Sequence, residues 1–170
     1  TLIALEPLMK IARVTALTLA TLAASTAFGV AHAQAVRTER NLSLELANQL
    51  AAATVASCLA SGYSVTAAVV DRAGQLRALQ RADQAGPHTI GAAQAKAFTS
   101  ASARNSTLAM MEGAQKNPGA ANLVHIPGFL LLGGGVPVKV ANDVIGAIGV
   151  GGAPGGHLDE QCALAALDKV

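Results

Sequence analysis

Glycines interrupt a run of β-branched residues near the C-terminal end of this 170-residue chain, between residues 133 and 163. Gly146 and Gly149 fall inside the segment 144–150, which has the composition of a β-strand. A glycine inside a strand weakens that strand unless another group must approach the backbone closely. We therefore expect a crossing helix, a flat ligand or a neighbouring subunit to lie directly against this strand.

The same glycines do not have the spacing of a nucleotide-binding loop. A Walker loop ends in Gly-Lys-Ser/Thr, whereas the only lysine of the stretch, Lys139, stands in the middle of an expected strand. The pattern G-x-G-x-x-G also fails, because Pro154 occupies the third glycine position when the count starts at Gly149. Gly155 and Gly156 precede a helix start that has its own acidic residues, which disfavour a bound phosphate, so we expect a turn there.

Large side chains are scarce: the chain has three Phe, one Tyr and no Trp. The core must therefore be built from Val, Ile, Leu and Ala, and we expect self-association to complete the burial of such a small core. The net charge is only +2, and the basic residues are scattered along the sequence. Without a basic cluster or aromatic stacking platforms, we do not expect nucleic-acid binding.

The N-terminal segment 9–33 has the three parts of a secretory signal peptide in order. They are basic residues at Lys10 and Arg13, an uncharged apolar stretch over 14–30, and the small-x-small pattern Ala31-His32-Ala33. We predict that residues 1–8 are non-native or a mis-called start, and that the mature protein is periplasmic or secreted, without a membrane span after cleavage. A membrane anchor is the alternative, but the apolar stretch is short for a span.

Residues 43–170 are expected to form one α+β domain, preceded by a flexible arm at 34–42. The predicted elements are a helix over 43–62 with Ser43 as N-cap, strands over 63–71 and 75–81, helices over 87–103 and 105–115, an irregular loop over 116–128, strands over 129–135, 136–140 and 144–150, and a final helix from about His157. Asn142-Asp143 is suited to a tight turn between the last two strands. Because hairpins dominate, the sheet should be antiparallel, with helices packed on it.

Five segments, taken in order, resemble the GlcG/HbpS family, which is related to the PduO C-terminal domain. They are VVDRAGQL (69–76), RADQAGP (81–87), AQAKAFTSA (93–101), PGFLLLGGGVPV (127–138) and VIGAIGVGGAPGGHLDEQCA (144–163). The resemblance extends over about residues 42–170 and implies profilin-like α/β/α layers, with a five-stranded antiparallel sheet flanked by helices. It also implies homo-oligomers.

The same resemblance implies an exported haem-binding protein with a role in haem buffering, transport or redox sensing. The alternatives are a binding module for a small organic acid, such as a 2-hydroxy acid, and a weak haem-degrading enzyme. No Ser-His-Asp or Cys-His arrangement can be argued from the sequence, so we predict no catalytic residue and favour a binding protein over an enzyme.

The candidate iron ligands are His88 and His125, since haem iron takes His, Met, Cys or Tyr. His88 follows a proline-containing loop at an expected helix start, where a solvated histidine is the alternative. It also stands where many relatives have a small hydroxyl residue. His125 lies in the irregular loop before Pro127, and loops carry functional residues more often than helices or strands do.

The resemblance also implies ligand-binding roles around two further motifs. Asp83 and Lys96 fall in the loop–helix region of the family, where they could pair with one another or hold a carboxylate such as a haem propionate; a surface ion pair is the alternative. The glycine-proline strand of the family corresponds here to residues Gly133, Gly134 and Gly135. In the organic-acid alternative, the N–H groups near these glycines and Lys96 would hold the ligand carboxylate.

Two cysteines, Cys58 and Cys162, fall on the inward faces of the first and last expected helices. In the fold that the resemblance implies, these helices pack side by side, and we hypothesise a disulfide that staples the small core. Metal binding by these cysteines is not expected, because the chain has no C-x-x-C pair.

Overall fold

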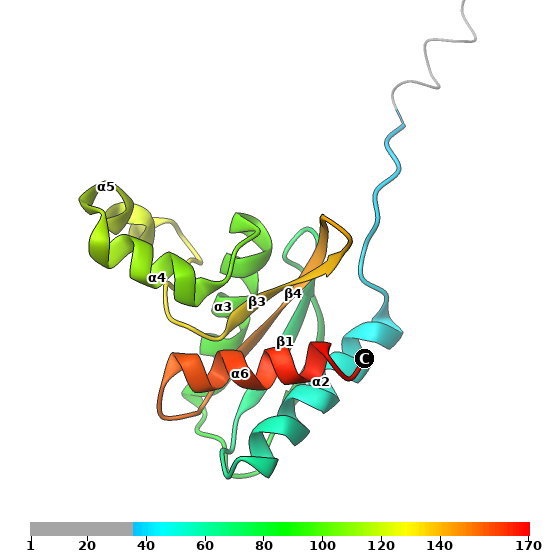
Figure 1. Ribbon diagram of the computed structural model, residues 1–170. Helices are drawn as coiled ribbons and strands as arrows, with labels where there is room; N and C mark the ends of the chain where they lie inside the picture. Colours follow the sequence, from blue (N-terminus) through cyan, green and yellow to red (C-terminus); the bar gives the residue numbers. More distant parts are fainter. Residues whose placement is uncertain (1–35) are drawn as a thin grey trace, which may run out of the picture. The chain divides into compact units, whose positions relative to one another are not determined.

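The computed structural model describes residues 36–170, so the predicted signal peptide at 9–33 and residues 1–8 lie outside the described residues. The elements, in chain order, are α2 (Leu44–Ala60), β1 (Thr66–Asp71), β2 (Leu76–Arg81), α3 (His88–Ala103), α4 (Thr107–Lys116), α5 (Pro118–Ala121), the 3-10 helix η2 (Asn122–His125), β3 (Gly135–Val140), β4 (Asp143–Gly151) and α6 (Gly156–Leu167). Figure 1 shows their arrangement, coloured along the sequence.

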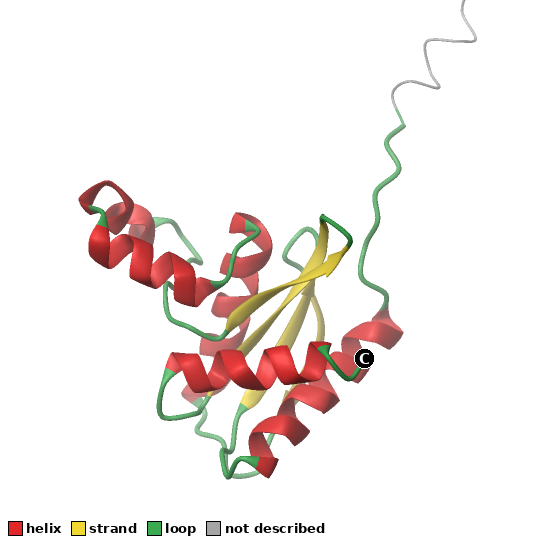
Figure 2. Cartoon of the chain, in the orientation of Figure 1, coloured by secondary structure: helices red, strands yellow, loops and turns green. Residues whose placement is uncertain are grey.

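The strands form one antiparallel sheet of four strands in the order β2-β1-β4-β3. Helices α2 and α6 cover one face of the sheet and α3 covers the other, as Figures 1 and 2 show. Successive strand residues point to opposite faces, so Val69 and Ile148 join the core under α2 and α6, whereas Ala68 and Ala147 pack under α3. The layer under α3 consists almost entirely of alanine, which lets this helix approach the sheet closely.

The expected α+β class and antiparallel sheet are confirmed, but the five-stranded sheet is wrong. The segment predicted as a strand over 129–135 is a loop until Gly135 begins β3. Its backbone bonds to threonine side chains: Thr99 Oγ1 accepts from the N–H of Leu130 at 2.8 Å, and Thr107 Oγ1 donates to the carbonyl of Leu132 at 2.7 Å. These hydroxyls take the place of a neighbouring strand.

The loop predicted over 116–128 contains two short helical turns, α5 and η2. Asn117 caps the first of them, since its side-chain oxygen accepts from the N–H of Gly119 at 2.9 Å. Together with α4 they form a projection, residues 107–126, which we call the helical arm (Figure 1). Within the arm only Thr107 is buried, so the arm has no core of its own.

The group that approaches Gly149 closely is a crossing helix, one of the three possibilities expected from the sequence. A Cβ at this position would collide with the carbonyl oxygen of Ala93 and lie 2.5 Å from the N of Ala97, both in α3. At Gly146 a Cβ would collide with the carbonyl oxygen of Val70. The protein's own backbone therefore explains these glycines.

Most local predictions hold. Ser43 caps α2 by accepting from the N–H of Leu46 at 3.1 Å, and the first hairpin lies where it was expected. The turn between β3 and β4 lies one residue earlier than predicted. It consists of Ala141 and Asn142, with Ala141 at a φ of 55°, while Asp143 already belongs to β4 and pairs with Arg72 at 2.7 Å.

Candidate ligand-binding site

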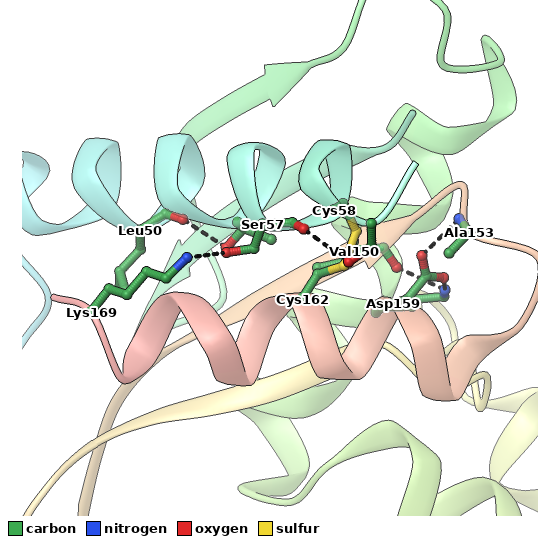
Figure 3. The surroundings of a disulfide bond; sticks show 11 residues. Leu50, Ser57, Cys58, Val150, Ala153, Asp159, Cys162 and Lys169 are labelled. Carbon is green, nitrogen blue, oxygen red and sulfur yellow. Dashed lines mark hydrogen bonds and ion pairs between the residues drawn. A yellow bond between two sulfur atoms is a disulfide. The ribbon is translucent and has the colours of Figure 1, made fainter. Parts of the chain in front are cut away.

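Lys96 projects from α3 into the interior, where its side chain is 2% exposed. Its Nζ donates to Asp159 Oδ2 at 2.7 Å and to the carbonyl oxygen of Val150 at 2.8 Å. The second carboxylate oxygen of Asp159 accepts from the N–H of Ala153 at 3.0 Å, an interaction visible in Figure 3. A pair of Lys96 with Asp83, one of the alternatives that the sequence left open, does not form, because Lys96 lies on the buried face of its helix and Asp83 is in an exposed loop.

Of the three glycines at 133–135, Gly134 lies directly against this buried ion pair, Gly135 lies against the backbone carbonyl of Lys96, and Gly133 packs on Gly156. A Cβ at Gly134, where φ is +117°, would lie 2.7 Å from Asp159 Cβ and 3.1 Å from Lys96 Nζ. All three glycines are buried. The structure thus brings together Lys96 and Gly133–Gly135, as the sequence analysis grouped them, but around an internal carboxylate in place of a ligand.

His88 is the first residue of α3 and is exposed. The start of the helix is fixed by Thr89, whose hydroxyl bonds to Thr66 Oγ1 at 2.7 Å and to the carbonyl of Gly86 at 2.6 Å. The imidazole lies over Gly86, since a Cβ there would be 2.8 Å from His88 Cε1. Within residues 36–170 no hydrogen bond or ion pair engages the His88 ring.

His125 and Asp83 lie elsewhere on the surface. His125 ends η2 in the helical arm and is exposed, and no partner among the described residues binds its ring. Asp83 lies in the exposed loop before α3 and lines a hollow of about 380 Å³ with Leu59, Ser64, Ala82 and Gln84. The predicted site residues therefore fall into separate places: a buried cluster at Lys96 and three exposed residues.

A groove of about 420 Å³ lies between α3, the turn from β1 to β2, and residues 127–128. We call it the α3 groove; it is lined by Val70, Gly74, Leu76, Gly91, Gln94, Ala95, Phe98, Pro127 and Gly128. Gln94 is the only lining residue with a polar side chain. The volume lies in the range of about 300–1,000 Å³ typical of small-molecule sites.

The end wall of the α3 groove is the ring of Phe98. Gly74 and Gly128, both at positive φ, flank this ring, because a Cβ at either would lie 2.7 Å and 3.2 Å from its carbons, respectively. The ring also meets Phe129 edge to face, with centroids 6.2 Å apart. The sequence analysis missed this groove. The lining residues come from segments far apart in the chain, so no local pattern indicated it.

Glu160 is a further carboxylate that the sequence analysis did not single out. Its Oε2 is buried without a hydrogen-bond partner among the described residues. Burial raises the pKa of Glu160 above its ordinary value of 4.5, and outweighs the lowering by the Ser106 hydroxyl and the N–H groups of Gly134 and Leu108. Burial likewise raises the pKa of Asp159, against the effect of Lys96.

The disulfide hypothesised between Cys58 and Cys162 is present and joins α2 to α6 (Figure 3). Both cysteines are buried. Over the described part of the chain, no cluster of three or more His, Cys, Asp or Glu side chains has the arrangement of a metal site. No helix within residues 36–170 has the length and apolar character needed to cross a bilayer.

Comparison with known proteins identifies a family and several relatives. The family model described as "Haem degrading protein HbpS-like" matches residues 42–168. Protein GlcG of Escherichia coli (strain K12) is 37% identical over 115 residues, which are 68% of this chain and 84% of that protein.

Solved structures with the same fold include a double mutant of HbpS from Streptomyces reticuli, with 39% identity and a TM-score of 0.74, covering 79% of this chain and 90% of that one. A complex of PduOC with haem has 22% identity and a TM-score of 0.68, covering 76% and 95% of the two chains. At that identity the PduOC structure supports the fold alone.

Proposed function

Because this chain belongs to the HbpS-like family of haem-degrading proteins, we propose that it is an exported haem-binding protein that buffers, transports or senses haem. One observation carries the proposal: helix α3 forms the floor of an apolar groove and also carries an exposed histidine, His88, whose ring has no hydrogen-bond partner among the described residues. The matching family is itself described by its relation to haem, and this supports the choice of ligand.

The residues present suit a haem group. The macrocycle requires an apolar surface and the iron requires a donor such as imidazole nitrogen. The α3 groove supplies the first, and His88 and His125 supply two rings that no described residue engages. When bound, haem would contribute a redox-active iron, while the protein's side chains would bind and orient the group.

We propose binding without a catalytic side chain. Asp159 is a buried carboxylate that could act as a base, but it already forms an ion pair with the ammonium of Lys96 at 2.7 Å. Both cysteines are joined in a buried disulfide, which removes them as nucleophiles. The organic-acid alternative loses its support, because it needs the ammonium of Lys96, and that group is buried and paired.

We also propose that the protein forms homo-oligomers and works in an oxidising compartment. The helical arm and the loop after it expose Val124, Ile126 and Leu132 by 52%, 41% and 43%, an apolar surface that a second copy would cover. A disulfide between helices is typical of exported proteins. Light scattering would test the oligomer, and fractionation of the native host would test export; a monomer, or a protein retained in the cytoplasm, would contradict the respective proposal.

Haem titration is the direct experiment. We expect a saturable Soret band with the wild-type protein, and a shifted band or weaker binding when His88 and His125 are both replaced by Ala. His157→Ala is the matched control, since His157 is an exposed histidine at the start of another helix, α6. Binding no tighter than to an unrelated protein of similar charge would refute haem binding.

A further inference from the structure

We propose that the α3 groove is the haem site and that His88 is the side chain that reaches the iron. This inference rests on the haem binding proposed above and assigns it to one place on the molecule. The groove and the histidine belong to the same helix, so their relation follows from helical geometry.

The floor of the groove is one stripe of α3. Gly91, Gln94, Ala95 and Phe98 all line it, and they recur at the spacing of three and four residues that marks a single helix face. His88 precedes Gly91 by three residues, so it lies on the same stripe about 4.5 Å further toward the helix N-terminus. The histidine therefore lies nearly one helical turn beyond Gly91, outside the residues that line the groove and with its ring over Gly86, while Phe98 lines the groove at the other end of the stripe.

Small residues keep the middle of this stripe open. A Cβ built on Gly91 meets no atom within 4 Å, so the glycine leaves space that a larger residue would fill. Ala95 adds only a methyl group beside it. The result is a floor of mostly small and apolar residues about two helical turns long, which leaves room for the face of a planar ligand.

The other hollows compared are less suited to haem. The hollow at Asp83, of about 380 Å³, presents a carboxylate that would repel the ligand's own propionates. The hollow on the helical arm is about 240 Å³ and the one beside the disulfide is about 180 Å³, both below the usual range of ligand sites. No histidine lines any of these three hollows or the α3 groove itself, but the α3 groove is formed by the helix that carries His88.

His88 is preferred over His125 as the iron ligand for two reasons. It projects from a 16-residue helix whose start is fixed by the Thr66–Thr89 hydrogen bond, so its position is defined. Its ring lies over Gly86 and makes no hydrogen bond with the described residues, so rotation of the ring breaks no hydrogen bond. His125 instead ends a four-residue 3-10 turn in the arm.

The test compares two glycine substitutions. Gly91→Leu would fill the groove, whereas Gly113→Leu places the same side chain on another helix, α4, outside the groove. Both glycines are helical and have nothing within 4 Å of an added Cβ, and Leu is the better helix former, so both variants should fold. Binding is measured with haem by the Soret band and with iron-free protoporphyrin IX by fluorescence.

We expect Gly91→Leu to weaken the binding of both porphyrins at least about tenfold, because overfilling a site costs more than about 1 kcal/mol of binding free energy. Gly113→Leu should bind both as the wild type does. His88→Ala should weaken or spectrally shift haem alone, since iron-free porphyrin has no metal to ligate; His125→Ala should change neither.

The outcomes separate the two levels of inference. If wild type binds haem and Gly91→Leu binds it equally, the groove assignment is wrong while haem binding stands. If Gly91→Leu binds the porphyrins weakly, but His125→Ala changes the Soret band and His88→Ala does not, the assignment of His88 as the iron ligand is wrong. If the wild type binds neither porphyrin above the unrelated control, the proposed function fails and the groove assignment fails with it.

Discussion

The ammonium of Lys96 and the carboxylate of Asp159 form a buried ion pair of 2.7 Å, with 2% and 3% of the side chains exposed. Lys96 belongs to α3 and Asp159 to α6, which cover opposite faces of the sheet (Figure 1). Nζ also bonds to the carbonyl of Val150 in β4. The pair therefore ties the two helical layers together past the end of a strand.

Removing one member of this ion pair should destabilise the folded protein. We expect Lys96→Met to lower the free energy of unfolding by about 3–5 kcal/mol, because it leaves the Asp159 carboxylate buried without its countercharge. Urea unfolding followed by circular dichroism measures the loss. Lys116→Met is the control, since Lys116 and Glu112 form an exposed pair at 3.9 Å, and it should change stability by less than about 0.5 kcal/mol.

The double variant Lys96→Met with Asp159→Asn tests the reason for the loss. Asn can still accept from the N–H of Ala153, and it carries no charge. The double variant should therefore be more stable than Lys96→Met alone. Equal destabilisation of the two would show that lost packing, and not the unpaired charge, dominates.

Glu160 gives the protein a predictable pH dependence. Its pKa in the folded state is raised above 4.5 by burial, so the folded protein holds this proton more tightly than the unfolded chain does. The favourable contribution is complete below about pH 4.5 and is lost as the pH rises through the folded-state pKa. At neutral pH the ionised carboxylate, with Oε2 unpartnered, destabilises the fold.

Glu160→Gln should therefore be more stable than wild type at neutral pH, with the advantage shrinking as the pH falls through the folded-state pKa of Glu160 toward 4.5. Urea midpoints measured from pH 4 to 8 would show it. Glu112→Gln, at the exposed end of an ion pair, serves as the control. An advantage of Glu160→Gln that grows toward low pH would contradict the predicted sign.

The elements that the sequence predicted correctly are those with local signals. The cap at Ser43 and the first hairpin depend on residues close together in the chain, and both lie where expected. The segment 129–135 has the composition of a strand, yet Leu130 and Leu132 form hydrogen bonds with the side chains of Thr99 and Thr107, 31 and 25 residues away. No pattern within the segment records those partners.

The same difference between local signals and distant partners applies to the site residues. His88 and His125 were selected by residue type and by their places at an expected helix start and in a loop, but their surroundings depend on the tertiary fold. Lys96 was placed with Asp83, 13 positions away, although its true partner Asp159 lies 63 residues along the chain. The α3 groove is assembled from a turn, a helix and a distant loop, so only the folded chain reveals it.

The two glycines of β4 that face α3 should respond differently to alanine. Gly149→Ala would drive a Cβ into the carbonyl of Ala93, a backbone atom that cannot move aside without shifting the helix. Gly151→Ala would place its Cβ 3.4 Å from Ala92 Cβ, an ordinary contact. We expect the first to cost about 3 kcal/mol or more and the second less than about 1 kcal/mol.

Thermal unfolding of the two variants measures this difference, and the shared strand and helix make each a control for the other. Equal stability of both variants would mean that α3 can move away from β4. The separation between helix and sheet would then be set by something other than the glycine.

The disulfide between Cys58 and Cys162 closes a loop of 104 residues, which is long for a chain of this size. Closing a long loop restricts the unfolded chain, so reduction should lower the free energy of unfolding by about 2–4 kcal/mol. The folded state should survive reduction, because α2 and α6 also pack through Leu50, Ala51 and Ala163. Urea unfolding with and without dithiothreitol tests this, and alkylation followed by mass measurement counts the thiols. A double variant, Cys58→Ala with Cys162→Ala, should have the same free energy of unfolding as the reduced protein, and dithiothreitol should not change that value. Two alkylated thiols in protein that was never exposed to reductant would contradict the disulfide bond.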